Sequence, residues 1–212
     1  MFYSTLSYSQ CSWKKLFPFK IGDDKFEISK KKSLNPTIID SKNPYIAFSK
    51  FERYKVKYDY MKDSAQINLI RLEYHNNKCF DNGEIVLFLV NNKLYKAEIS
   101  IRFNTYSEMI KKYNYILKIV PKRYVYAYDN TITDSNTKEK IGEGIIFCEN
   151  NYKNDEKDKI WNDYLSVSYT FNYERKFDEE KKKVYFTNNI EDYELQIKIV
   201  DLRNVVLNRF GY

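Results

Sequence analysis

The sequence has few of the residues that punctuate loops and few of those that carry catalytic chemistry. Only 5 glycines and 4 prolines occur among 212 residues, which argues against a protein dominated by loops. There is one histidine, His75, so a serine or cysteine nucleophile has a single candidate base. Cys79 follows it closely, but the segment EYHNNKCF is better interpreted as a strand end beside a turn. No cysteines or histidines are paired at zinc spacing, so we expect no metal.

Other catalytic patterns are also missing. The GEG segment at 142–144 is too short for a phosphate-binding loop, and we interpret it as a bulge or a close backbone approach. Adjacent carboxylates such as Asp23 and Asp24 have the character of solvated surface groups. A pair of acids drawn from distant strands is the one enzymatic arrangement that stays open. We therefore expect a protein that is not an enzyme and has no cofactor.

Long apolar runs are absent as well, since no stretch reaches the roughly 18 residues that a membrane helix needs. The formal net charge is +7, but acidic residues are mixed through the chain, so we interpret it as ordinary surface charge. Nucleic acid is therefore an unfavoured partner.

Aromatic residues are abundant, with 21 tyrosines and 14 phenylalanines. A chain of this length and apolarity buries a core without needing extra cross-links, and it is too apolar to be disordered.

The first segment, MFYSTLSYSQCSW, carries no charge until Lys14. Ser7 and Ser9 flank Tyr8 in the small-x-small pattern that a signal peptidase needs. The segment resembles the end of a bacterial secretory signal peptide, with cleavage after Ser9. We interpret residues 1–9 as a remnant of such a peptide, whose basic and apolar regions would lie upstream, and residues 10–212 as a single domain.

Three cysteines, Cys11, Cys79 and Cys148, are present. Export favours one disulfide, and Cys148 lies in the apolar run GIIFCEN, where it is expected to be buried. We therefore predict a bond between Cys11 and Cys79 and a thiol at Cys148. Two alternatives stay open. Cys11 could carry a lipid, although Gln10 and Tyr8 depart from the usual lipidation motif, and in the cytosol all three would be reduced.

Alternating apolar and polar residues predict a sheet. The run EIVLFLV, the turn NNK and the alternating run LYKAEISIRF at 94–103 together indicate a hairpin. Further strands are expected in INLIRLEY, GEGIIFCE, YLSVSYTFNYE and YELQIKIVDL, with a charged turn at 177–183. The fold class is therefore α+β, a curved antiparallel β-sheet with one main helix packed on it.

The main helix is expected at about 105–120. Thr105 and Glu108 have the spacing of a capping box, and Pro121 ends the helix. Its apolar residues fall on one stripe, which we expect to face the core. The stripe consists of Tyr106, Met109, Ile110, Tyr113, Leu117 and Val120.

A second resemblance covers residues 16–103. The segment LFPFKIG leads through Gly22 into a short helix capped by Asp23 or Asp24, and an antiparallel sheet follows. This order is similar to that of the BamE or SmpA-like envelope lipoproteins. Asp23 and Asp24 stand where that family has a small apolar residue and a hydroxyl residue. The resemblance implies a non-catalytic envelope module, and no binding residue is carried over from it.

Aromatic and basic residues interleave at 51–60 and 122–128. Tyrosine rings can stack on sugars or bases while basic side chains meet phosphate, although tyrosine is also an ordinary strand residue. In the second stretch the three tyrosines are expected on one face of an extended strand. The candidate binding residues are Tyr54, Lys55, Lys57, Tyr58, Tyr124, Tyr126 and Tyr128.

Three functions are compatible with these features. The leading hypothesis is an exported, non-enzymatic envelope or periplasmic protein that binds another protein or a surface polymer. The first alternative is a cytosolic interaction protein of the immunity or inhibitor type. The second alternative is a single-strand nucleic-acid binder that uses the tyrosine and lysine stretches.

Overall fold

The computed structural model describes residues 11–29, 35–40, 67–74, 79, 83–90, 92–134, 137–149 and 163–201. The described helices are α1 (Trp13–Leu16), α2 (Lys25–Ser29) and α5 (Tyr106–Ile119). The described strands are β1 (Asn35–Asp40), β2 (Ile67–Tyr74), β3 (Gly83–Val90), β4 (Lys93–Phe103), β5 (Tyr124–Thr133), β6 (Lys140–Glu149), β7 (Asp163–Asp178) and β8 (Lys183–Asp201).

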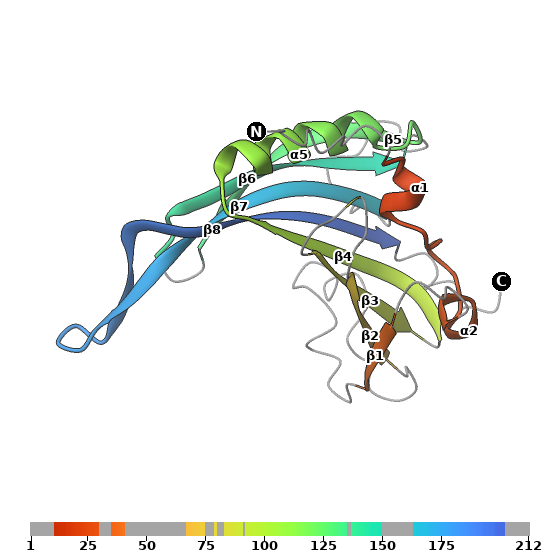
Figure 1. Cartoon of the computed structure of the whole chain (residues 1–212), viewed down its shortest axis with the longest axis horizontal. Coiled ribbons are helices and arrows are strands. Elements are labelled where there is room, and N and C mark those ends of the chain that lie inside the picture. The colour runs from red at the N-terminus through yellow and green to blue at the C-terminus, as the bar shows by residue number, and fades with distance from the viewer. Residues whose placement is uncertain are drawn as a thin grey trace, which may run out of the picture.

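These strands form one curved sheet in the order β1-β2-β3-β4-β8-β7-β6-β5, and every neighbouring pair is antiparallel (Figure 1). Helix α5 lies along one face of it. The chain first makes a four-stranded meander from β1 to β4. It then crosses the sheet through α5 to the opposite edge and returns through β5, β6 and β7 to β8. The predicted α+β architecture, a curved antiparallel sheet with one main helix, is confirmed.

The core lies between α5 and the sheet face beneath it. The alternation predicted for β4 and β8 holds, because Ile99 lies opposite Ile197 in the register and both are fully buried. The first described segment of the chain adds to the same core. The side chains that it buries there are Cys11, Leu16, Phe17, Phe19 and Ile28.

One local departure from alternation occurs where β3 meets β4. The register shifts between Phe88 and Leu89, so that Leu94 pairs with Leu89 and packs within the core cluster. The ring of Tyr95 instead lies edge-on to that of Phe88, with centroids 6.4 Å apart. A β-bulge adds one residue to a strand and changes which side chain faces inward, so strict alternation from the sequence could not assign Tyr95.

Helix α5 has the predicted ends. Thr105 is its N-cap, with its hydroxyl oxygen 3.3 Å from the amide nitrogen of Glu108 and 2.9 Å from the Glu108 carboxylate. Its buried face is rotated from the predicted stripe. Met109, Tyr113 and Ile116 are buried, whereas Leu117 is only partly buried. Three more members of the predicted stripe, namely Tyr106, Ile110 and Val120, are also exposed or only partly buried.

Thr105→Ala is expected to lower the free energy of unfolding by about 1 kcal/mol, because the first turn of α5 loses its side-chain cap. Urea unfolding followed by circular dichroism measures this difference. Thr105→Ser, which retains a capping hydroxyl, is the matched control and should stay close to the wild type. Equal losses in both variants would contradict the capping role.

The short helix predicted after Gly22 is α2. Asp24 caps it, since its carboxylate accepts a hydrogen bond from the Glu27 amide at 2.8 Å. Gly22 has a φ of 95°, a left-handed conformation that glycine adopts without steric cost. Its amide donates to the Leu94 carbonyl at 2.7 Å, which ties this end of the N-terminal segment to the start of β4.

The close backbone approach predicted at GEG is confirmed between β6 and β7. An ideal Cβ on Gly142 would lie 2.0 Å from the Tyr169 carbonyl oxygen, and one on Gly144 would lie 2.5 Å from the Ser168 Cβ. Only glycine fits at these two positions without a shift of the neighbouring strand.

Beyond the body of the sheet, β7 and β8 continue as a two-stranded ribbon (Figure 1). Pairing of β8 with β4 ends at Tyr193, and pairing of β7 with β6 ends at Thr170. Near its base the ribbon is held by Arg175, whose guanidinium lies 3.2 Å from the buried carboxylate of Asp134. Its exposed apolar residues are Phe177, Val184, Tyr185 and Ile190. Phe177 and Val184 are register partners and share one face of the ribbon, whereas Tyr185, next to Val184, points to the opposite face.

Candidate ligand pocket beside the disulfide

The predicted disulfide between Cys11 and Cys79 is present. The two Cα atoms are 5.6 Å apart, and the bond joins positions separated by 68 residues. Both cysteines are buried in the core cluster. Cys148 takes no part in the bond and is buried, as its apolar surroundings in the sequence predicted. A disulfide of this kind persists in an oxidising environment.

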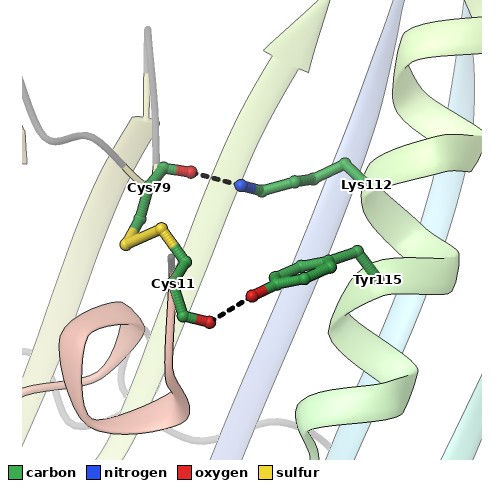
Figure 2. The surroundings of a disulfide bond; sticks show 4 residues. All are labelled: Cys11, Cys79, Lys112 and Tyr115. Atoms are coloured by element: carbon green, nitrogen blue, oxygen red, sulfur yellow. Dashed lines mark hydrogen bonds between the residues drawn. A yellow bond between two sulfur atoms is a disulfide. The ribbon is translucent and has the colours of Figure 1, made fainter. Parts of the chain in front are cut away.

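Helix α5 holds the backbone at both cysteines (Figure 2). The amine of Lys112 donates a hydrogen bond to the Cys79 carbonyl, and the hydroxyl of Tyr115 donates one to the Cys11 carbonyl, each at 2.5 Å. Lys112 and Tyr115 are three residues apart, so they project from the same side of the helix. The disulfide is therefore braced against α5 by two side chains as well as by packing.

No role for Lys112 was predicted from the sequence, because lysine is rarely buried. Only 4% of its surface is exposed, and a buried amine is costly unless it is hydrogen-bonded. The Cys79 carbonyl provides a partner. The signal that could have found it is its spacing, since it lies three residues after Met109 and four before Ile116, on the buried face of the helix.

The disulfide fixes the start of a segment that forms one wall of a pocket. From Cys11 the chain runs through α1 to Phe17 and Phe19, whose rings pack edge-on with centroids 5.7 Å apart. It then reaches Gly22, which is hydrogen-bonded to Leu94. The segment from 13 to 21 is thus anchored at both ends, and the wall it forms is held in place.

The pocket has a volume of about 680 Å³ and lies at the end of the sheet where β8 finishes and β5 begins. One wall is the segment 13–21, and the other comes from the α5–β5 connection and the end of β8. Its described lining residues are Trp13, Lys14, Phe17, Pro18, Phe19, Lys20, Ile21, Pro121, Arg123, Tyr124, Ile199 and Asp201. The volume is within the range of small-molecule sites, and the lining combines aromatic, aliphatic and charged side chains, four of each.

Arg123 is oriented by its neighbour Tyr124. Its guanidinium carbon lies 4.9 Å from the centroid of the Tyr124 ring, and one of its nitrogens lies 3.3 Å from the Tyr124 hydroxyl. A cation over a ring face is attracted by the ring quadrupole. The Tyr124 ring is buried, so it gives Arg123 a fixed support at the pocket.

Of the predicted binding residues that the structure describes, Tyr124 lines this pocket. Tyr126 and Tyr128 lie farther along β5 and are exposed. The prediction that all three share one face is wrong. Tyr126 pairs with Phe147, and Tyr128 pairs with Ile146. Phe147 and Ile146 are successive residues of β6, so they point to opposite faces of the sheet. The two tyrosines therefore also point to opposite faces, because the register shifts between them.

The other predicted binding residues, Tyr54, Lys55, Lys57 and Tyr58, lie outside the described residues, as do His75 and the predicted signal remnant at 1–9. None of the pocket residues in the segment 13–21 was predicted from the sequence. A signal was present, because SWKKLFPFKI interleaves aromatic and basic residues in the manner noted at 51–60. Asp201 lies far from these residues in the sequence, so no local pattern indicates that it lines the same pocket.

A polar cluster is centred on Glu143 of β6, opposite Tyr169 of β7. Its carboxylate accepts hydrogen bonds from Lys140 and from the Tyr169 hydroxyl, and these interactions lower its pKa. Burial is the main reason that the pKa of Tyr113 is raised to about 12, and it also raises the pKa of Tyr169. The pKa of the carboxyl thus lies further below 7, and the pKa values of the two tyrosine hydroxyls lie further above it. None of these three groups gains or loses a proton near pH 7.

Within the parts of the chain that the structure describes, no group of three or more histidine, cysteine or acidic residues could hold a metal ion. None of the helices described there is long and apolar enough to cross a membrane. Comparisons with protein-family models, with curated proteins and with solved structures find no match. The resemblances to a signal peptide and to the BamE or SmpA-like lipoproteins stay predictions.

Proposed function

We propose that this protein is an exported, non-enzymatic envelope or periplasmic protein that binds a surface polymer or another protein. The observation that carries the proposal is the pocket whose wall is anchored by the Cys11–Cys79 disulfide. A buried disulfide favours an oxidising compartment, and an anchored aromatic wall favours binding over chemistry. Among the described residues, the carboxyl groups with a shifted pKa have it lowered and the tyrosines have it raised, away from neutrality, which is compatible with binding.

Cell fractionation with peptide mapping tests the location. The full gene with its upstream region is expressed in a bacterial host, thiols are blocked with iodoacetamide at lysis, and peptides are mapped without reduction. We expect the envelope or periplasmic fraction to contain a linked Cys11–Cys79 peptide. Recovery of the protein in the cytosol with all three cysteines alkylated would contradict export. A lipid on Cys11 would contradict the disulfide while leaving the envelope location intact.

The β7–β8 ribbon favours the alternative of an immunity or inhibitor-type protein. Its exposed Phe177 is 60% accessible and lies beside its exposed register partner Val184, and neighbouring exposed apolar residues are typical of protein-binding sites. The two proposals differ in compartment, so the same fractionation separates them. A cytosolic protein with reduced cysteines would favour this alternative.

Single-strand nucleic-acid binding has less support. Tyr124 is buried and Tyr126 and Tyr128 point to opposite faces, so these tyrosines form no continuous stacking platform. We expect no sub-micromolar complex with a labelled oligothymidylate at physiological salt, and any binding at low salt should weaken steeply as salt rises. Fluorescence anisotropy at roughly 50 mM and 150 mM salt measures this. Tight binding at the higher salt would reverse the order of the hypotheses.

A further inference from the structure

One face of the β7–β8 ribbon continues the surface on which α5 packs. Along β7 the side chains of Phe171, Tyr173 and Phe177 follow one another at alternate positions, so they share the face of the core residue Tyr169. The ring of Phe171 stacks on that of Tyr106, the first residue of α5, with centroids 5.9 Å apart. The ribbon projects past this end of the helix (Figure 1). The face therefore leaves the cover of α5 at Tyr106.

Strand β8 contributes the other half of the same face. Val184 lies opposite Phe177 in the register, and Ile190 lies opposite Tyr173. The ring of Phe186 lies beside that of Tyr173, with centroids 5.6 Å apart. We call this surface the ribbon strip, and it consists of Tyr106, Phe171, Tyr173, Arg175, Phe177, Val184, Phe186, Ile190 and Tyr193.

The ribbon strip is accessible along its length. Phe177 is 60% exposed, Tyr106 is 43% exposed and Val184 is 40% exposed, and the other apolar members are exposed or partly buried. Since a large aromatic side chain has on the order of 200 Å² of surface, these fractions leave roughly 500 Å² of the strip open to solvent. A continuous apolar patch of that size is typical of an interaction site.

The charges on the ribbon allow an identical strip to approach. Arg175 lies on the strip, but its guanidinium is 3.2 Å from the Asp134 carboxylate and its central carbon is 5.4 Å from the centroid of the Phe186 ring. The ion pair neutralises this cation. Across a two-fold axis each surface meets its own copy, so a strip with an uncompensated charge would repel itself. The ribbon strip avoids this repulsion.

The two ends of the strip determine how a second copy fits. Helix α5 covers the sheet at one end, and the charged turn at 179–182 closes the other. A second ribbon laid antiparallel on the strip would lie in the same layer as α5, because packed layers are about 10 Å apart. Each turn then meets the start of the other copy's α5, so the assembly closes at two copies. The strips bury about 1,000 Å² between them, the lower limit of a specific interface.

We propose that this protein forms a two-fold symmetric dimer in which the ribbon strips of two copies pack face to face and antiparallel. Because the interface is apolar and of modest size, the dimer is reversible, with a dissociation constant of roughly 1–100 µM. The inference concerns assembly, so it does not depend on the compartment or the ligand proposed above. It does remove the ribbon as a binding site for a different protein.

Analytical ultracentrifugation of the full chain tests the proposal at concentrations from about 1 µM to about 200 µM. We expect the weight-average mass to rise with concentration from that of one chain toward that of two. Raising the salt concentration to about 0.5 M should not weaken the dimer, because salt screens charges and not apolar contacts. A single chain at every concentration would overturn the proposal, and so would masses above that of two chains.

Two matched substitutions locate the contact. Phe177→Ser removes an exposed ring from the strip and should raise the dissociation constant at least about tenfold, because the dimer contains this side chain twice. Tyr185→Ser removes an exposed ring from the opposite face of the ribbon and should change the constant less than about twofold. Thermal melts verify that both variants remain folded. Equal effects of the two substitutions would contradict packing through the strip.

A third variant tests the edge of the sheet as the site of contact. Tyr126 lies on β5, the last strand in the order of the described sheet, and is 58% exposed. Tyr126→Ser should leave the dissociation constant within about twofold of the wild type. A dimer that survives Phe177→Ser and is lost in Tyr126→Ser would join the copies through β5, and that result would overturn the proposal.

Discussion

Replacing Cys79 with serine is expected to lower the free energy of unfolding by about 4 kcal/mol. The bond closes a loop between positions 68 residues apart, and in the chain-entropy model a loop of that length greatly restricts the unfolded chain. The substitution also leaves a hydroxyl in the buried cluster around Cys11. Both effects act in the same direction.

Unfolding in guanidinium chloride, with and without a reducing agent, measures this loss. Reduction should destabilise the wild type by about as much as the substitution does, and it should leave Cys79→Ser unchanged. Cys11→Ser and the double variant should lie close to Cys79→Ser, because the cross-link is lost only once. A wild type insensitive to reduction would contradict the stabilising role of the bond. Cys148 takes no part in the bond, so the reducing agent should leave its thiol unchanged.

The second large effect is expected in the core beneath α5. Met109→Ala and Ile116→Ala should each cost roughly 2–5 kcal/mol, because both side chains are fully buried and truncation leaves a cavity. Leu117→Ala should cost less, since that side chain is only partly buried. Asn114→Ala, on the exposed side of the helix, should change stability by less than about 0.5 kcal/mol.

Urea unfolding of these four variants ranks them directly. The order of Ile116 and Leu117 is the informative comparison, because the sequence stripe placed Leu117 in the core and the structure places Ile116 there. A larger loss for Leu117→Ala than for Ile116→Ala would mean that the helix is rotated from the arrangement described. A shared, negligible loss would mean that this face of α5 does not pack on the sheet.

Local features of the fold were predictable where neighbours in sequence determine them. The cap at Thr105 and the stop at Pro121 define α5 because both act within a single turn of helix. The hairpin between β3 and β4 follows from two apolar runs around an asparagine turn, where Asn92 adopts a φ of 63°. The Cys11–Cys79 pair was predictable because Cys148 lies in an apolar run that buries it.

The candidate site was much less predictable. Tyr124 was singled out for its residue type, but its role as a buried support for Arg123 depends on the α5–β5 connection. Lys112 was not predicted because lysine is rarely buried, and its hydrogen bond to the Cys79 carbonyl joins residues far apart in the sequence. The position of Tyr128 depends on a register shift, which responds to the partner strand and leaves no mark in local alternation.

By itself the sequence determined the α+β class, the ends of the main helix and the alternating strands. These depend on backbone preferences and on the period of apolar residues, both of which act over a few positions. Only the tertiary structure decided that β8 returns to pair with β4, which face of α5 is buried, and that Trp13, Arg123 and Asp201 line one pocket. Those outcomes depend on contacts between segments far apart in the chain, whose energies no short stretch of sequence contains.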